Sequence, residues 1–216
     1  SPAKPLYKVA DSERALARFS SIPFHQPKTV RDGLSVTLRR AGHILGAATV
    51  DCAWGGTRIV FSGDLGRFGD EVMLDPEPVE AADYLILEST YGDRRHNPAD
   101  PQEALSEVVN ATTARGGTVV IPAFAVGRVQ ALLYHIEQAM ASGKMRKVPV
   151  FLDSPMAVNA SDLLCTHLDD HRLPAGACIR ACGVAEYIRD VDASKALTHN
   201  PVPKVIISAS GMATGG

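Results

Sequence analysis

The sequence predicts an α/β protein in which a β-sheet comes first and alternating helices and strands follow. Up to Gly92 the apolar segments are short and have the patterning of strands. From Asp93 onward the apolar spacing alternates between the periods of helices and strands, as a parallel α/β unit requires. We therefore expect two units, 1–92 and 93–216, the second incomplete at its C-terminal end.

The strands expected in the first unit either alternate with polar residues or follow glycine turns: 34–38, 48–50, 58–61 and 84–87. The loops around 84–87 are rich in Asp, Pro and Gly, which favour turns. This part of the chain therefore reads as a sheet.

The second unit has clear start and stop signals. Pro101 can open a helix that Gly116-Gly117 ends, before a buried strand at 119–121. A second helix has an apolar stripe before Gly143: Val129, Leu132, Leu133, Ile136 and Met140. Further elements are a strand at 148–152, in which Pro149 favours an edge or a strand start, a helix capped by Ser154-Pro155, short helices within 173–203, and a strand at 204–207.

Composition limits the function. The net charge of -2 and pI near 6.4 exclude a generally basic nucleic-acid surface, so any RNA contact must be local. The four cysteines form no C-x-x-C pair, which favours reduced core thiols and a cytoplasmic protein. No apolar run approaches the roughly 20 residues that span a bilayer, so no membrane contact is expected.

Two segments place a possible metal ligand between glycines beside a strand: Gly42–Gly46, with His43, and Ser62–Gly66, with Asp64. Imidazole nitrogens and carboxylate oxygens are normal zinc ligands, and loops at strand ends bring distant residues together. Each segment alone is more readily interpreted as a capped turn.

Further motifs follow these two along the chain, in this order: Glu88–Gly92, Pro122–Gln130, Asp153–Ala157 and Ser208–Gly216. Together the set resembles the β-CASP metallo-β-lactamase-fold RNA nucleases of the bacterial RNA-processing exonuclease and endonuclease branch. The resemblance implies part of a metallo-β-lactamase αββα sandwich at 1–92 and a β-CASP parallel α/β domain at 93–216. A split sandwich would leave an apolar face uncovered, which predicts either oligomerisation, such as a homodimer, or partial disorder.

The resemblance also implies roles for individual residues. His43 is a ligand of one zinc, Asp64 bridges two zinc ions, and Glu88 is the acidic residue beside them. Arg128 begins a helix, where a cation is unfavourable unless an anion such as an RNA phosphate is present. The loop after the last strand is expected to bind RNA phosphates through Ser208, Ser210, Gly211, Thr214 and Gly215.

These residues also have alternative interpretations without a catalytic or RNA-binding role. Glu88 can be a solvated strand end, and Arg128 can form a structural salt bridge with Asp153 or Glu88. His167 and His171 are not interpreted as the catalytic site, because the family's first cluster is His-x-His-x-Asp-His and no His-x-His occurs here. An i,i+4 histidine pair is expected on a solvated helix face.

The expected function is zinc-dependent hydrolysis of single-stranded RNA in RNA processing or decay, with endonucleolytic and exonucleolytic cleavage both open. A small-molecule hydrolase of the metallo-β-lactamase fold and a non-catalytic RNA- or protein-binding paralogue are the alternatives. The chain offers only His43 and Asp64 at metal-motif positions, whereas a catalytic zinc normally takes three protein ligands. We therefore expect this chain by itself to hold no stoichiometric zinc and to be inactive.

Overall fold

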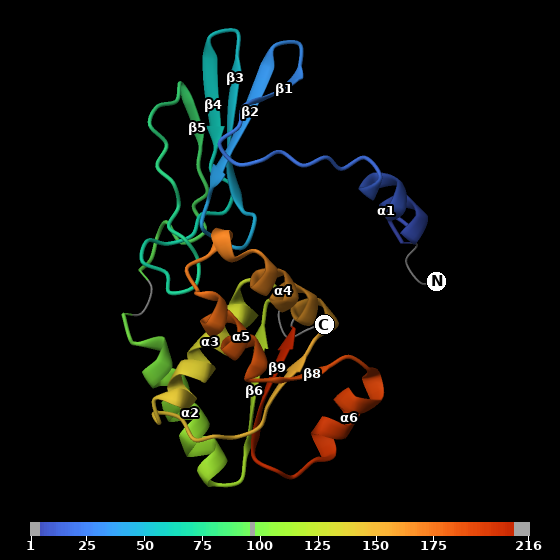
Figure 1. Ribbon diagram of the computed structural model, residues 1–216, viewed down its shortest axis with the longest axis vertical. Helices are drawn as coiled ribbons and strands as arrows, with labels where there is room; N and C mark the ends of the chain where they lie inside the picture. The colour runs from blue at the N-terminus through green and yellow to red at the C-terminus, as the bar shows by residue number, and fades with distance from the viewer. Residues whose placement is uncertain (1–4, 96–97, 210–216) are drawn as a thin grey trace.

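The computed structural model describes residues 5–95 and 98–209, and two separate sheets dominate it (Figure 1). A five-stranded sheet comes first along the chain, and a four-stranded sheet with its helices follows. The change from strand-only to alternating patterning was therefore predicted correctly. No helix in the described ranges is both long and apolar enough to cross a lipid bilayer.

The first sheet has the order β1-β2-β3-β4-β5. Its strands are β1 Lys28–Arg31, β2 Leu34–Arg40, β3 Ala48–Trp54, β4 Thr57–Phe61 and β5 Tyr84–Ile86. Neighbouring strands are antiparallel except for β4 and β5, which are parallel. As a result β2, β4 and β5 all run in the same direction and end at one edge of the sheet.

Two elements of this region were not predicted. The helix α1 Val9–Leu16 buries none of its residues, and every residue of β1 is exposed. At eight and four residues, both elements are shorter than the window in which a periodic apolar pattern identifies a helix or strand. The strand β1 is held by its pairing with β2, a contact that local patterning does not reveal.

Apolar side chains are exposed at the β5 edge of the first sheet. Around β5 the side chains of Tyr84, Leu85, Ile86 and Leu87 are 49–62% exposed, and Phe61 at the end of β4 is 43% exposed. Contiguous exposed apolar side chains of this kind mark a surface for interaction.

The second sheet is entirely parallel and has the order β6-β9-β7-β8. Its strands are β6 Thr118–Ala123, β7 Val150–Asp153, β8 Glu186–Ile188 and β9 Lys204–Ala209. Its helices are α2 Pro101–Ala114, α3 Arg128–Ala141, α4 Pro155–Thr166, α5 Ala175–Gly183 and α6 Val191–His199, with a short 3-10 helix at Leu168–Asp170.

Helices cover both faces of the parallel sheet (Figure 1). Because strand side chains alternate between faces, Val150 and Leu152 of β7 join the main core with α2, α3 and α4. Phe151 points the other way and packs with Leu197 of α6. The stripe predicted for α3 faces the main core, since Val129, Leu133 and Ile136 are fully buried there and Leu132 and Met140 are partly buried.

The helix starts agree with their local signals. The Asp100 side chain accepts a hydrogen bond from the Gln102 backbone N–H at 2.8 Å, and Pro101 follows as the first helical residue of α2. Ser154 accepts from the Ala157 N–H at 3.2 Å and so caps α4. Pro149 lies immediately before β7, so the strand-start interpretation is right and the edge interpretation is wrong, because β7 is an interior strand.

Polar contacts join the two sheet regions. The Arg172 backbone N–H donates to the Val72 carbonyl at 2.8 Å, and its side chain donates to the Met73 carbonyl at 2.9 Å and pairs with Asp75 at 2.5 Å. Arg40 at the end of β2 binds Asp170 at 2.9 Å. The junction is therefore a specific, hydrogen-bonded contact between segments about 100 residues apart in sequence.

Candidate active site

The candidate site begins at the edge of the first sheet where β2, β4 and β5 end. His43 follows β2, Asp64 follows β4, and Glu88 follows β5, so all three lie on loops at the same edge. His43 and Asp64 are exposed and Glu88 is half-buried. Sequence positions 45 residues apart are thus brought to one place by strand direction alone.

The loops of His43 and Asp64 pack directly on each other. The Gly66 N–H donates to the Ala41 carbonyl at 2.8 Å. A methyl group on Gly66 would lie 1.9 Å from the Gly42 oxygen and 2.8 Å from the His43 nitrogen, so only glycine allows this approach. Gly42 has a φ of +69° and a side chain there would meet the Leu74 carbonyl at 2.5 Å, so it too must be glycine.

Glu88 ties the two neighbouring loops together. Its Oε1 accepts from the Leu65 N–H at 2.9 Å and its Oε2 accepts from the Thr90 N–H at 3.2 Å, while its own N–H donates to the Ser62 hydroxyl at 3.0 Å. The Leu65 N–H, followed by the Thr90 bonds and the charge of nearby His43, lowers the pKa of Glu88 against the opposing effect of burial. Glu88 is therefore an ionised, fixed carboxylate beside His43.

The start of α3 lies against the His43 loop. Gly127, directly before α3, has a φ of +83°, and a methyl group on it would lie 2.6 Å from Cγ2 of Ile44. Arg128 is exposed and follows at the first helical position. It makes no ion pair with Asp153 or Glu88, so the structural salt bridge considered for Arg128 is not formed with either of them.

Gln130 shapes this helix start, and sequence reasoning gave it no role. Its side-chain oxygen accepts from the Gly127 N–H at 2.7 Å. Its side-chain nitrogen lies 3.0 Å from the Ser161 hydroxyl and also donates to the Ala125 carbonyl at 3.2 Å. A buried amide that satisfies both the turn before α3 and the helix α4 fixes where Arg128 emerges.

Ser208 lies at the C-terminal edge of the parallel sheet. In β9 it pairs in register with Pro122 of β6 and with Asp153 of β7. The turn that leads to Arg128 follows β6, so Ser208 and Arg128 lie at the same edge of this sheet. Asp153 accepts from the Ser194 hydroxyl at 2.7 Å and so anchors α6 there. Ser210, Gly211, Thr214 and Gly215 lie outside the described residues.

Comparison with known proteins agrees with this arrangement. A model of the Beta-Casp domain matches residues 129–216. Residues 129–216 belong to the Beta-Casp domain family. It is 34% identical to Ribonuclease TTHA0252 of Thermus thermophilus, over 99% of this chain and 50% of that protein. It is 30% identical to the RNase J-like protein of Methanocaldococcus jannaschii, over 97% and 50%.

A eukaryotic relative is Endoribonuclease YSH1 of Kluyveromyces lactis, 30% identical over 76% of this chain and 22% of that protein. The chain spans about half the length of the first two relatives. The mixed α/β architecture with a parallel sheet is that of a β-CASP protein.

The donor set at the first sheet edge fits zinc only in part. His43 and Asp64 offer one imidazole and one exposed carboxylate, which are ordinary zinc ligands. Both Glu88 oxygens already accept backbone N–H bonds, which suits Glu88 to positioning. Within the described ranges, three or more potential ligand atoms converge at a different place, the cysteines of α4 and α5.

His171 corrects one expectation for this β-CASP chain. It does not lie on a solvated helix face but is 5% exposed, beyond the end of α4. Its Nε2 donates to the Leu164 carbonyl at 2.9 Å and its Nδ1 accepts from the Leu173 N–H at 3.1 Å. A ring with one donating and one accepting nitrogen is the neutral form, so His171 is a structural core residue and the rejection of a catalytic role stands.

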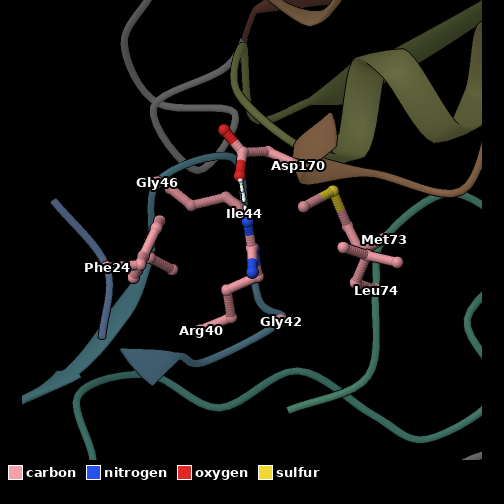
Figure 2. A pocket seen from close by; sticks show the side chains of 9 residues that line it. Phe24, Arg40, Gly42, Ile44, Gly46, Met73, Leu74 and Asp170 are labelled. Carbon is pink, nitrogen blue, oxygen red and sulfur yellow. Dashed lines mark hydrogen bonds and ion pairs between the residues drawn. The ribbon is translucent and has the colours of Figure 1, made fainter. Parts of the chain in front are cut away.

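Two hollows lie at the junction of the sheets. The first is lined by Phe24, Ile44, Met73 and the ion pair of Arg40 with Asp170, which point toward each other across it (Figure 2). The second is an apolar cavity of about 110 Å³ between the two sheet regions, lined by Leu45, Val72, Met73, Val126, Gly127, Gln130, Ala160, Leu163 and Leu164. The junction thus combines apolar contacts and an ion pair with unfilled space.

Proposed function

We propose that the protein containing this chain is a zinc-dependent ribonuclease that cleaves single-stranded RNA in RNA processing or decay. Relatives named as ribonucleases and an endoribonuclease support RNA as the substrate class. One observation carries the proposal: the loops of His43, Asp64 and Glu88, at the edge of the first sheet, lie against the start of α3.

In this proposal residues 1–92 supply metal ligands and residues 93–216 hold the RNA. His43 and Asp64 would hold zinc together with further ligands, and zinc when bound supplies a hydroxide nucleophile at neutral pH and charge stabilisation for the phosphodiester. Glu88 keeps the Asp64 loop in place through the Leu65 N–H and presents a negative charge beside His43. That charge favours the orientation in which an imidazole donates its second ring N–H away from the metal.

Arg128 would hold an RNA phosphate close to the proposed metal ligands. Its backbone lies at the N-terminus of α3, where the helix dipole and the guanidinium both attract an anion. Ser208 at the same sheet edge would add a hydroxyl, and Ser210, Gly211, Thr214 and Gly215 are proposed to continue the phosphate site. With a net charge of -2, such a local site is the way this chain attracts RNA.

The experiment compares Arg128→Ala with Arg146→Ala in the full-length protein, measuring binding to labelled single-stranded RNA over a range of salt concentrations. Arg146 is also exposed but precedes β7, at the opposite edge of the parallel sheet. Loss of one phosphate contact should weaken binding by Arg128→Ala and reduce the slope of log K against log salt by about 0.7. Arg146→Ala should leave both unchanged.

Cleavage of the same RNA, with zinc removed by a chelator and then restored, tests the catalytic half. Activity that depends on zinc and is lost in His43→Ala and Asp64→Ala supports hydrolysis by the metal centre. RNA binding without cleavage in the wild-type protein would instead support the non-catalytic paralogue. Equal slopes for the two arginine variants would remove Arg128 from the RNA site.

A further inference from the structure

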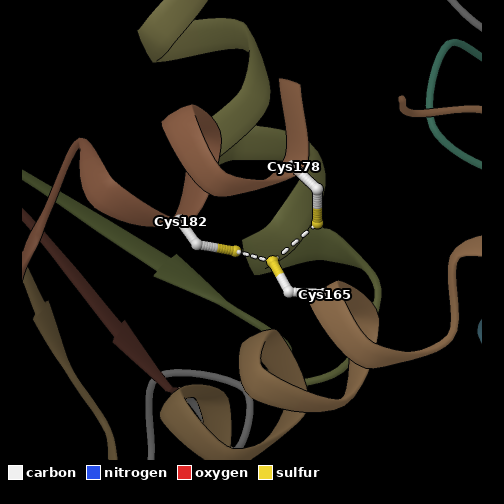
Figure 3. A group of neighbouring side chains, drawn as sticks. All are labelled: Cys165, Cys178 and Cys182. Atoms are coloured by element: carbon white, nitrogen blue, oxygen red, sulfur yellow. Dashed lines mark hydrogen bonds between the residues drawn. The ribbon is translucent and has the colours of Figure 1, made fainter. Parts of the chain in front are cut away.

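Three of the four cysteines meet between α4 and α5 (Figure 3). The Sγ of Cys165 lies 2.7 Å from that of Cys178 and 3.1 Å from that of Cys182. All three sulfurs lie within 4.8 Å of one another. All three are free thiols, and the fourth cysteine, Cys52, lies apart in β3.

Helix geometry explains the meeting. Cys178 and Cys182 are four residues apart in α5 and so point from the same face of that helix. Cys165 lies in the last turn of α4, which packs against α5. In Figure 3 the three side chains point toward a common centre. Three sulfurs placed about 2.3 Å from one ion would lie about 4 Å apart, so binding an ion would move the Cys165 sulfur about 1 Å away from the other two.

The surroundings are apolar and hold one polar group that nothing else uses. The cluster packs with Leu164, Leu173 and Val72, and Cys178 is completely buried. Burial raises the pKa of Cys165 to about 11 and that of Cys182 to about 12, so the metal-free cluster carries thiols. The Tyr187 hydroxyl is buried beside Cys182 and makes no standard hydrogen bond in the described part of the chain.

We propose that Cys165, Cys178 and Cys182 form a binding site for a thiophilic monovalent metal ion, Cu(I), separate from the proposed catalytic centre. Thiolate sulfur is the ligand that Cu(I) prefers. Binding displaces thiol protons to solvent as copper–sulfur bonds form, with no change of oxidation state. The buried Tyr187 hydroxyl lies beside Cys182 and can donate a hydrogen bond to the Cys182 thiolate.

Zinc fits this group less well than Cu(I). Structural zinc sites almost always have four protein ligands in a tetrahedron, and the convergent group in the described ranges has three, all of them sulfur. Three soft ligands without an imidazole or a carboxylate therefore favour Cu(I).

Occupancy of this site should affect the junction between the sheets. The same apolar cluster includes Leu45, two residues after His43, and Val72 and Met73 from the segment that binds Arg172. An ion bound by residues of both α4 and α5 links the two helices. Because it binds the folded state, it raises the free energy of unfolding. Cu(I) should therefore raise the melting temperature of the protein.

The test is an anaerobic titration of the reduced protein with Cu(I) in competition with a chelator that is coloured when it holds Cu(I). We expect one ion per chain to be withdrawn from the chelator, a sulfur-only coordination shell by X-ray absorption, and a higher melting temperature. Cys165→Ser should abolish the site, because Cys165 contacts both other sulfurs. Tyr187→Phe should weaken Cu(I) binding ~10–100-fold.

Cys52→Ser is the matched control and should bind Cu(I) like the wild-type protein. Circular dichroism must show that each variant is folded, and Cys178→Ala serves as a second ligand deletion if Cys165→Ser does not fold. Sulfur-bound copper that persists in Cys165→Ser and Cys178→Ala would overturn the proposal. A protein that binds zinc tightly but withdraws no Cu(I) from the chelator would also overturn it. A disulfide among these cysteines in the protein as isolated would do the same.

Discussion

Replacing Gly66 by alanine should separate the two loops that carry His43 and Asp64. The added methyl group would lie 1.9 Å from the Gly42 oxygen and 2.2 Å from the Gly42 carbonyl carbon. These are backbone atoms, so no side-chain rotation relieves the clash. Overpacking typically costs about 1–3 kcal/mol, and loss of the Gly66 N–H bond to Ala41 adds about 1 kcal/mol. Unfolding free energy should fall by about 2–4 kcal/mol.

Urea unfolding followed by fluorescence measures this loss, because the single tryptophan, Trp54, lies in β3 of the same sheet. Gly183→Ala is the control: a methyl group on Gly183, the last residue of α5, meets nothing within 4 Å, and alanine there should be neutral or stabilising by up to about 1 kcal/mol. In the full-length protein Gly66→Ala should also weaken zinc binding. Equal stability of Gly66→Ala and the wild-type chain would refute the close packing of these loops.

Three further outcomes are expected. The pKa of Glu88 is lower in the folded protein than its unfolded value near 4.5. The ionised Glu88 therefore stabilises the folded state fully above that unfolded value, and this stabilisation is lost as the pH falls through the lower folded value. In urea unfolding measured against pH, Glu88→Gln should remove this loss of stability in acid. Arg172→Ala should raise the pKa of Asp75, which Arg172 chiefly lowers, and an unchanged NMR titration of Asp75 would contradict the ion pair. Metal analysis of the purified 216-residue chain should find no stoichiometric zinc dependent on His43, whereas one or two such ions would refute the ligand count.

Most of the fold could be predicted from local sequence signals. Proline and cap residues before α2 and α4, and the apolar stripe of α3, are properties of neighbouring residues, so they predict the elements that the structure contains. The meeting of His43 with the Asp64 loop was also accessible, because strand direction brings loops at alternate strand ends together. A family resemblance added the order of the motifs, which local patterning does not contain.

Contacts that depend on how side chains and helices pack in the folded protein could not be predicted. The spacing of His167 and His171 suggested one helix face, yet α4 ends at Thr166 and the chain turns His171 inward. The cysteines form no C-x-x-C pair, and their meeting depends on how α4 packs on α5. The same holds for Gln130, whose partners lie on α4 and in the turn before α3.

Apolar packing sets the distance between the proposed metal ligands and the proposed phosphate contact. Gly127 lies so close to Ile44, the neighbour of His43, that a side chain at Gly127 would force the Ile44 side chain to move. Leu45, the next residue, packs into the cluster formed by α3, α4 and α5. These contacts place Arg128 and His43 on neighbouring segments of the junction, which also holds the apolar cavity of about 110 Å³. Under the proposed function this separation matters, because a displacement of about 1 Å at a reacting centre can cost ~100-fold in rate.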